Sequence, residues 1–317
     1  MKSMKLSVKG LVARYSSVDG PVYAVEDVNF DLNEGESIGI AGESACGKST
    51  LGLAIIRMLS GGKIQGQIIL DDESILDLSE SDFDEKFRWK KISMIFQGAM
   101  NSLDPVFTIK DQFVEVLKQH NFQGDIEETI RDAIRSVSLD EDVLKRYPHE
   151  LSGGMKQRVI ISMALLLKPK FVIADEPTTA LDVLIQAQIV NLLKKLKKEG
   201  MAFMLITHDL ALLSEISDKI GIMYGGQMVE LGSSFEIYKN PKHPYTQGLL
   251  KSIPTLHGDP PTYINGIPPS LLNPPTECRF IERCPLAFEK CKQLPPKFKT
   301  KTGYVQCWLY EDEALST

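Results

Sequence analysis

The chain has 317 residues, of which 43% are hydrophobic and 25% are charged, as in an ordinary globular protein. This length predicts roughly two domains. The net charge of −6 disfavours a nucleic-acid partner, so we interpret the lysine-rich run 194–198 as a solvated helix face. The sequence offers neither an apolar stretch that would span a bilayer nor a signal-peptide core at the N-terminus, which leads us to expect a cytoplasmic chain that reaches a membrane only through a partner.

The first part of the chain reads as β-structure. Alternating apolar and polar residues over 5–33 predict antiparallel strands that turn at residues 19–21. A buried strand then leads into a Gly-rich loop, and the apolar run 51–56 after the loop predicts a helix. Short strands are expected over residues 37–41, 66–70 and 92–96.

The middle of the chain changes character. Apolar periodicity over 108–167 predicts amphipathic helices, which we interpret as a helical insertion. Strand patterns return at residues 170–174, 202–206 and 220–224, with helical segments between them. Strands that alternate with helices predict an α/β fold with a mainly parallel sheet. After residue 240, frequent prolines predict an irregular appendage or a linker.

The loop over residues 42–50 carries the strongest motif, a glycine followed by four residues and then Gly-Lys-Ser. Between a strand and a helix this spacing predicts a phosphate-binding loop, whose backbone N–H groups and helix N-terminus bind a polyphosphate. Lys48 is expected to reach the β- and γ-phosphates, and the Ser49 hydroxyl to coordinate Mg²⁺. The alternative is a Gly-rich turn that matches by chance. The expected nucleotide contacts of the loop are Gly42, Ser44, Cys46, Gly47, Lys48, Ser49 and Thr50.

Two acidic residues end the apolar run 171–174. Ligands bind at the carboxyl ends of strands in a parallel α/β sheet. Asp175 therefore suits a magnesium-associated acid, and Glu176 suits a general base that polarises the attacking water. Taken without context, two adjacent acids are equally well explained as a solvated strand end.

A second anion site is predicted at residues 151–158. Ser152, Gly153 and Gly154 open a strongly helical run, and helix N-termini bind anions. One nucleotide does not need two such sites in one chain, so the second site suits a nucleotide held by another molecule.

In this order the motifs resemble those of the nucleotide-binding subunit of an ATP-binding-cassette (ABC) transporter. The resemblance covers about residues 4–252. It implies a P-loop NTPase cassette with a mainly parallel sheet core, an antiparallel β subdomain and a helical insertion at about 100–165. It further implies a nucleotide-binding domain over 1–240 and a C-terminal extension over 241–317.

The resemblance also assigns roles to single residues. Residues 151–157 match the signature sequence, with Met155 in place of the usual glutamine. Gln97 matches the Q-loop, which senses magnesium and contacts the membrane subunits. Residues 180–182, which end in Asp182, match the D-loop, and His208 matches the switch histidine that contacts the γ-phosphate. The implied catalytic residues are Glu176, His208 and Lys48, and the implied magnesium ligands are Ser49, Gln97 and Asp175.

Four further positions bear on nucleotide binding. Tyr15 matches the aromatic residue that stacks on adenine, with Tyr23 as the alternative. Ala45 stands where the similar proteins usually have glycine, and alanine resists a positive φ. Cys46 would be a small buried hydrophobe whose alkylation blocks nucleotide binding.

Four of the five cysteines lie in the last part of the chain. In a reducing compartment such a cluster favours a metal over disulfides. Intervals of five, six and fifteen residues differ from the paired spacing of zinc ribbons and suit a 4Fe–4S cluster, with zinc or unligated thiols as alternatives. Some peptide-importer ATPase subunits, which this chain resembles, carry such a segment. The four cysteines are Cys278, Cys284, Cys291 and Cys307.

Residues 42–44, 101–105 and 240–250 resemble the dipeptide and oligopeptide importers within this family. The implied function is ATP hydrolysis that energises peptide import, by a peripheral subunit at the cytoplasmic face of the cell membrane. The implied partners are a second, paralogous ATPase subunit closing head to tail on this one, two transmembrane permease subunits and, indirectly, an external peptide-binding protein. The alternatives are a nickel or other solute importer, a soluble cassette ATPase of DNA repair or translation, and a regulatory subunit with a dead site.

Overall fold

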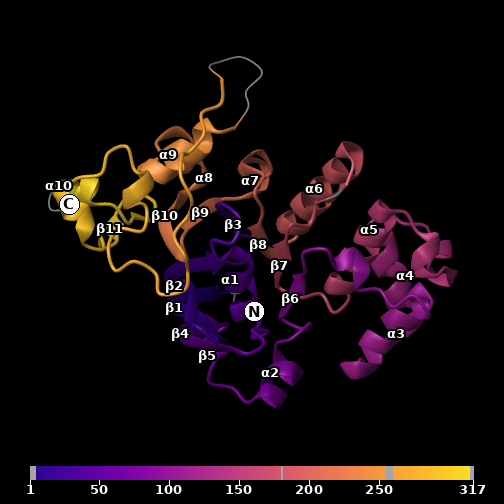
Figure 1. Cartoon of the computed structure of the whole chain (residues 1–317). Helices are drawn as coiled ribbons and strands as arrows, with labels where there is room; N and C mark the ends of the chain where they lie inside the picture. The colour runs from indigo at the N-terminus through magenta and orange to yellow at the C-terminus, as the bar shows by residue number, and fades with distance from the viewer. Residues whose placement is uncertain (1–4, 180, 254–259, 315–317) are drawn as a thin grey trace. The chain divides into compact units, whose positions relative to one another are not determined.

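The computed structural model describes residues 5–179, 181–253 and 260–314. The chain divides into two compact units, and each is described by itself (Figure 1). Unit 1 comprises Met1–Asn33, Ser37–Leu76 and Leu205–Thr317, and unit 2 comprises Glu34–Glu36 and Asp77–Met204. The phosphate-binding loop and the cysteine segment therefore belong to one unit, and the helical insertion belongs to the other. The sequence-based boundary at residue 240 stays a prediction.

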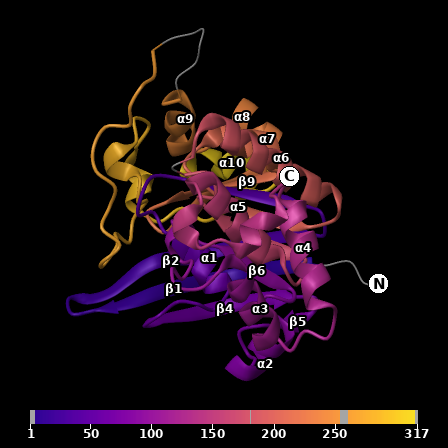
Figure 2. The same ribbon diagram turned by 90° about the vertical axis from the view of Figure 1, so that its right-hand side faces the viewer.

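Unit 1 begins with a four-stranded antiparallel sheet in the order β2-β1-β4-β5. Its strands are β1 (Lys5–Ser17), β2 (Gly20–Asn33), β4 (Gly62–Leu70) and β5 (Glu73–Ser74). The alternation that predicted antiparallel strands is confirmed, since Tyr15 pairs with Val22 next to the tight turn. The two long strands β1 and β2 form a ribbon that Figure 2 shows side-on.

A second sheet in unit 1 has the order β11-β12-β10-β9-β3, followed by the end of β8. Its strands are β3 (Ser37–Ala41), β8 (Ala202–Ile206), β9 (Lys219–Tyr224), β10 (Gln227–Ser233), β11 (Phe298–Lys299) and β12 (Tyr304–Val305). All of β3 is buried, and it pairs in parallel with β9. The first three strands of this order, β11, β12 and β10, extend the sheet beyond β9 in antiparallel fashion. The sheet is thus parallel where β3 delivers the phosphate-binding loop.

The helices of unit 1 are short. They are α1 (Lys48–Ile55), α7 (Leu210–Ile216), α8 (Ser234–Lys239), α9 (Pro244–Lys251) and α10 (Glu311–Ala314), with 3₁₀ turns at η4 (Ile281–Arg283), η5 (Glu289–Lys292) and η6 (Trp308–Tyr310). Of these, α1 begins directly after the phosphate-binding loop, at Lys48.

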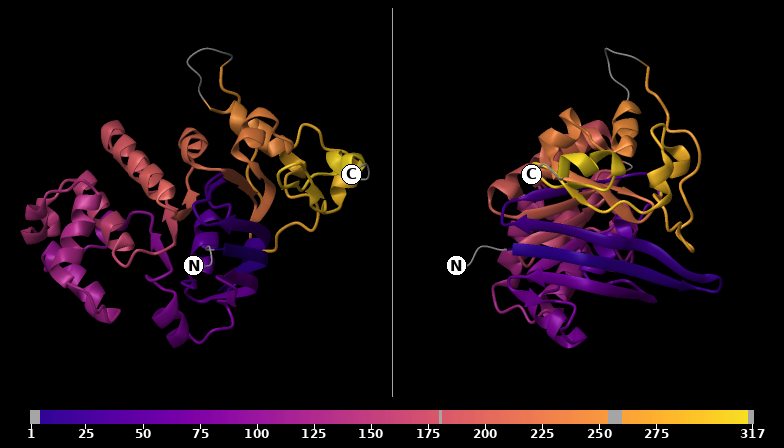
Figure 3. Two further views of the ribbon diagram at one scale, coloured as in Figure 1. Left: turned by 180° about the vertical axis from the view of Figure 1, so that it is seen from behind. Right: turned by 90° about the vertical axis from the view of Figure 1, so that its left-hand side faces the viewer.

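The expectation that everything after residue 240 is irregular is wrong in part. Pro244 opens α9, at a position where the missing backbone N–H costs nothing because no helical partner exists for it. Strand β12 pairs with β10, so the C-terminal segment adds an edge to the second sheet (Figure 3). The two strands β11 and β12 have two residues each, too few for any alternation to show in the sequence.

Unit 2 holds the remaining strands and the helical insertion. Strand β6 (Ile92–Ile95) pairs in parallel with β7 (Phe171–Asp175), and the start of β8 lies on the other side of β7. Its helices are α2 (Glu80–Lys86), α3 (Ile109–Gln119), α4 (Ile126–Ser136), α5 (Gly153–Leu165) and α6 (Val183–Lys198), with 3₁₀ turns at η1 (Ala99–Asn101), η2 (Glu141–Lys145) and η3 (Pro148–Glu150).

The predicted helical insertion is present as α3, α4 and α5, with α4 packed against both of the others. Phe113 and Leu117 on α3 and Ile130 and Ile134 on α4 are at most 1% exposed. Burying each such side chain contributes about 1.5–3 kcal/mol, so these helices are stabilised by packing along one face. Among the described helices, none is both long and apolar enough to cross a bilayer.

The first turn of α3 is closed by a capping box. Thr108 Oγ1 accepts a hydrogen bond from the Asp111 N–H at 3.2 Å, and the Thr108 N–H donates to Asp111 Oδ2 at 3.2 Å. We expect Thr108→Ala to lower the free energy of unfolding by about 1 kcal/mol, because the Asp111 N–H loses the hydroxyl oxygen that accepts its hydrogen bond. Urea unfolding followed by circular dichroism measures this. Thr108→Ser should retain the stability, and an unchanged midpoint in Thr108→Ala would contradict the role of the cap.

Candidate functional site

The phosphate-binding loop joins β3 to α1 within unit 1. Gly47 occupies the N-cap position of α1, and the Lys48 side chain folds back across the loop. Its Nζ donates to the carbonyl oxygens of Gly42 at 2.7 Å and Glu43 at 2.8 Å. The ammonium group is thus held over the loop, where it can meet a bound phosphate.

Glycine is required at both ends of this loop. Gly42 has a φ of 151°, and a Cβ there would lie 2.1 Å from Met223 O at the end of β9. Gly47 has a φ of 104°, and a Cβ there would lie 1.9 Å from Ala24 O of β2. No side chain fits either position, so the loop backbone lies directly on both sheets of unit 1.

Ala45 adopts the conformation that the sequence put in doubt, with a φ of 62°. A left-handed conformation costs an L-residue about 1–2 kcal/mol. The loop therefore keeps its path with alanine, at an energetic cost that glycine would avoid.

Two tyrosines compete for the predicted adenine contact. Tyr15 is half-buried, and its hydroxyl lies 3.3 Å from Thr50 Oγ1 in the first turn of α1. Tyr23 has the Arg14 guanidinium over its ring, 5.0 Å from the centroid. Tyr15 is thus connected to the phosphate-binding loop, while one face of Tyr23 is already covered.

His208 is exposed and follows β8 in unit 1. The Thr207 N–H donates to Ile40 O of β3 at 3.2 Å, so the end of β8 lies beside the end of β3. His208 and the start of the phosphate-binding loop are therefore at the same edge of the sheet.

Unit 2 carries a second group of predicted site residues at the carboxyl ends of its strands. The pairing of Ile95 with Ala174 places two predicted residues at neighbouring strand ends: Asp175 is the last residue of β7, and Gln97 lies two residues beyond β6. Asp175 is 3% exposed, whereas Gln97 is exposed. Glu176 has a φ of 50° and accepts a hydrogen bond from Thr179 Oγ1 at 2.9 Å. The left-handed backbone turns the Glu176 side chain away from the line of β7.

The signature sequence forms the N-terminus of α5. Ser152 caps the helix by accepting a hydrogen bond from the Met155 N–H at 3.3 Å, and both Ser152 and Gly153 are exposed. The predicted D-loop ends in Asp182, which caps α6 through the Ile185 N–H at 2.9 Å. Ala180 of that loop lies outside the described residues.

Gln157, one turn into α5, ends the predicted signature sequence, but its structural contact was not predicted from the sequence. Its side chain is 4% exposed, and Nε2 donates to Pro177 O at 2.8 Å. The signature helix is thereby tied to the residue that follows Glu176. Gln157 is flanked by Lys156 and Arg158, so the sequence gives no local signal that its side chain is buried.

The structure therefore assembles two sets of the predicted residues, one in each unit. Unit 1 holds Tyr15, the phosphate-binding loop and His208, and unit 2 holds Gln97, the signature residues 152–154, Asp175, Glu176 and Asp182. How the two sets combine around one nucleotide stays a prediction.

The four C-terminal cysteines line one cavity of about 10 Å³ in unit 1. Burial raises the pKa of Cys278 to about 11 and that of Cys307 to about 12. Within the described residues, no group of three or more His, Cys, Asp or Glu side chains has an arrangement that would hold a metal ion. The sequence grouping is thus confirmed as a spatial gathering of thiols, and the metal centre stays a prediction.

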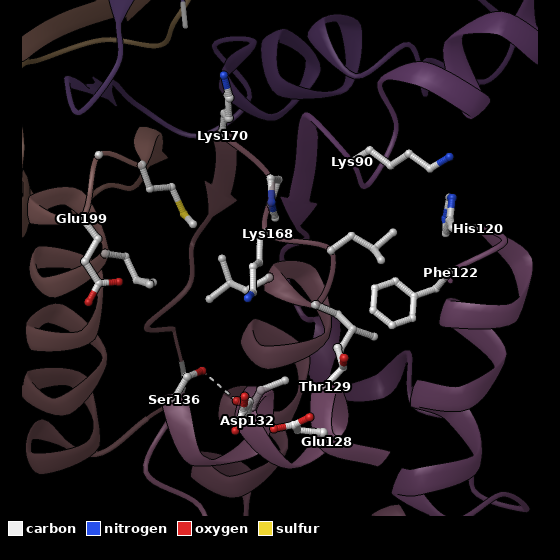
Figure 4. Close-up of a pocket in the computed structure, with 18 of the residues that line it drawn as sticks. Lys90, His120, Phe122, Glu128, Thr129, Asp132, Ser136, Lys168, Lys170 and Glu199 are labelled. Carbon is white, nitrogen blue, oxygen red and sulfur yellow. Dashed lines mark hydrogen bonds between the residues drawn. The ribbon is translucent and has the colours of Figure 1, made fainter. Parts of the chain in front are cut away.

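A larger cavity of about 970 Å³ lies in unit 2, away from the motifs. It is lined by residues that precede β7 and β8, such as Lys168, Lys170 and Met201, and so lies at the amino ends of those strands. Figure 4 shows Lys168 between Glu199 on one side and Lys90 and His120 on the other. The cavity is therefore separate from Asp175 and Glu176, which lie at the carboxyl end of β7.

Comparison with known proteins identifies the family. A family model described as ABC transporter matches residues 25–179, and one described as the C-terminal region of oligopeptide/dipeptide transporters matches residues 229–291. The oligopeptide transport ATP-binding protein OppD of Escherichia coli K12 is 45% identical over 320 residues, which cover 98% of this chain and 94% of the relative. The chain belongs to the ABC transporter family.

Other members of this ABC transporter family agree with that assignment. The dipeptide transport ATP-binding protein DppD of Caldanaerobacter subterraneus is 42% identical over 321 residues, 98% of either chain. Among solved structures, the dimeric ATP-binding cassette MJ0796 bound to ADP and Pi is similar, with a TM-score of 0.65 and 27% identity over 72% of this chain and 98% of that chain. The predicted cassette fold is thus confirmed.

The thiol of Cys46 provides a chemical probe of the phosphate-binding loop of this ABC transporter chain. Burial raises its pKa, although Lys48 lies close by and opposes the shift. Since the thiolate is the reactive form, we expect iodoacetamide to alkylate Cys46 slowly at pH 7, with the rate rising about tenfold per pH unit and without a plateau at pH 9. Mass spectrometry of the Cys46 peptide measures the rate.

Two controls accompany this experiment. Mg·ATP should protect Cys46 from alkylation, and Cys46→Ser should bind ATP regardless of the reagent. A rate that levels off below pH 8 would show that Lys48 stabilises the thiolate and would contradict the expected direction of the shift.

Proposed function

We propose that this chain is the ATP-hydrolysing subunit of an ABC importer for dipeptides or oligopeptides. The observation that carries the proposal is the phosphate-binding loop, with the Lys48 ammonium held over its backbone by two carbonyl oxygens. The peptide branch is supported by the relatives, which are named as dipeptide or oligopeptide transport ATP-binding proteins, and by the match over residues 229–291.

In the proposed site, backbone N–H groups of residues 42–47 and Lys48 bind the phosphates. Ser49, Asp175 and Gln97 offer the oxygen donors that suit Mg²⁺, which would neutralise phosphate charge when bound. Glu176 accepts a proton from the attacking water, and His208 contacts the γ-phosphate. Tyr15 stacks on the adenine.

The proposed partner for the signature residues is a second ATPase subunit. Ser152 and Gly153 are exposed at a helix N-terminus, which suits a phosphate brought by another molecule. The solved cassette MJ0796 is described as dimeric, which supports a pair of such subunits. Two permease subunits and an external peptide-binding protein complete the proposed importer, with this chain peripheral at the cytoplasmic face of the membrane.

The alternative functions differ in what the protein would transport or bind. A nickel or other solute importer would use the same ATPase chemistry with another cargo, and no relative named above is described in those terms. A cassette ATPase of DNA repair or translation would bind nucleic acid, which a net charge of −6 disfavours. Copurification with membrane subunits, and not with DNA or ribosomes, distinguishes these classes.

Glu176 gives the direct test of the hydrolytic role. We expect Glu176→Gln to keep ATP binding and to lower turnover by about 10²-fold or more, because the amide cannot accept the proton of the attacking water. Steady-state phosphate release and equilibrium binding of Mg·ATP measure the two effects. Lys48→Ala serves as the control that should lose binding itself. Turnover that persists in Glu176→Gln would refute the assignment of the base.

We further propose that the four C-terminal thiols bind a metal centre. Four thiolates are the donor set of 4Fe–4S clusters and also of structural zinc. The cavity that the four thiols line has a volume of only about 10 Å³, so binding either a single zinc ion or a larger cluster would require the thiols to rearrange. The cluster is our first candidate on the sequence intervals, with zinc as the alternative.

Anaerobic purification followed by iron, sulfide and zinc analysis decides between the candidates. A cluster predicts about four irons per chain and a brown colour, which Cys291→Ser should abolish. One zinc per chain in a colourless protein would replace the cluster by a structural ion. Cys46→Ser is the matched control, because that thiol belongs to the phosphate-binding loop and should leave the metal content unchanged.

A further inference from the structure

A buried ion pair joins the phosphate-binding loop to the C-terminal segment. Arg283 Nη1 lies 2.8 Å from Glu43 Oε2, and Nη2 lies 2.9 Å from Glu43 Oε1. The Arg283 side chain is 5% exposed and the Glu43 side chain 26%. This two-point geometry fixes the orientation of the carboxylate as well as its distance. Glu43 is the residue directly after Gly42, inside the loop.

The other donors of Arg283 are also in use. Nε donates to Asn265 O at 2.9 Å, and Nη1 also donates to the Tyr224 hydroxyl at 3.2 Å. The guanidinium carbon lies 5.6 Å from the centroid of the Tyr224 ring. The hydrogen bonds to the Glu43 carboxylate raise the pKa of Arg283, so the guanidinium remains charged. Arg283 therefore has a fixed position and does not sample the surface.

A second contact holds the backbone of the same loop residue. The Glu43 N–H donates to the Tyr245 hydroxyl at 2.9 Å, and Tyr245 is fully buried in α9. The Tyr245 ring packs against Tyr224 and Phe280, with centroids 4.5 and 5.5 Å away. Phe280 lies between Cys278 and Cys284 in sequence, so the aromatic cluster connects the cysteine segment to the loop.

Glu43 is thus held at each of its polar groups. Its side chain binds Arg283, its N–H binds Tyr245, and its carbonyl oxygen accepts from Lys48 Nζ at 2.8 Å. A displacement of Glu43 would move a carbonyl that positions the Lys48 ammonium. The C-terminal segment therefore acts on the group that is expected to meet the phosphates.

We propose that Arg283, supported by Tyr245, is a positioning residue for ATP: it clamps Glu43 so that the phosphate-binding loop and Lys48 keep their binding geometry. The inference rests on the proposed function, in which this loop binds ATP. It gives the C-terminal segment a role in nucleotide affinity in addition to any metal that the segment binds.

A matched control lies on the same segment. Lys297 Nζ lies 2.7 Å from Asp27 Oδ2 and ties the C-terminal segment to β2 at a residue outside the phosphate-binding loop. The Lys297 side chain is 17% exposed. Lys297→Met therefore removes a comparable anchor without touching Glu43.

The experiment compares Mg·ATP affinity, the KM for ATP, kcat and the melting temperature across variants of the full chain. We expect Arg283→Gln to raise the Kd and KM for ATP about tenfold, within the usual range of coupling between neighbouring sites, with kcat changed less than about twofold. Lys297→Met should leave the Kd and KM unchanged. Arg283→Lys should fall between the parent and Arg283→Gln, because one ammonium cannot satisfy both carboxylate oxygens.

A double-variant cycle keeps the test decisive if Arg283→Gln alone fails to fold. Glu43→Gln with Arg283→Gln leaves no unpaired buried charge, and we expect its Kd for ATP to be no weaker than that of Glu43→Gln. Unchanged Kd and KM in Arg283→Gln would overturn the proposal, as would additive effects in the double variant. An equal loss of ATP affinity in Lys297→Met would also overturn the proposal, because it would show that any weakened anchor of the C-terminal segment lowers affinity through general stability.

The same measurements separate this inference from the proposed function. If the parent chain binds no Mg·ATP, the proposed function fails, and the inference fails with it. If the parent binds ATP and Lys48→Ala does not, while Arg283→Gln binds as the parent does, only the inference fails.

Discussion

The turn from β3 into α1 can follow only one path, because the backbone at each of its ends lies against a carbonyl oxygen of another strand. Met223 of β9 stands against Gly42, and Ala24 of β2 stands against Gly47. The two sheets of unit 1 therefore meet at this loop and determine its shape. Lys48 extends from a backbone that is fixed on both sides, which reduces the conformational freedom that ligand binding would otherwise remove.

The C-terminal segment is anchored to both sheets of unit 1. It extends the second sheet through the pairing of β12 with β10, and Gln306 donates its backbone N–H to Val229 O at 2.8 Å. The Tyr23 N–H donates to Leu271 O at 2.8 Å, which attaches the same segment to β2. Beyond α9, the helices and strands of the segment have only two to four residues each, and these anchors to preformed strands supply the order that a separate core would provide in a larger domain.

Sequence reasoning succeeded where one local pattern determines one structure. The strand–loop–helix around Lys48, the buried run that ends at Asp175 and the cap at Ser152 are all present as expected. It failed where the structure depends on distant partners. Nothing local to Arg283 or Gln157 indicates that Glu43 or Pro177 lies opposite, because these pairs form only when segments far apart in the chain fold together.

The anchor between Gln157 and Pro177 makes two distant parts of unit 2 mechanically continuous. Ser152 begins the helix that carries Gln157, and Glu176 directly precedes Pro177. A helix transmits displacement along its axis with little deformation, and a buried hydrogen bond to a carbonyl resists separation. A displacement of the exposed N-terminus of α5 is therefore transmitted to Pro177, the residue next to Glu176, without direct contact with the Glu176 carboxylate.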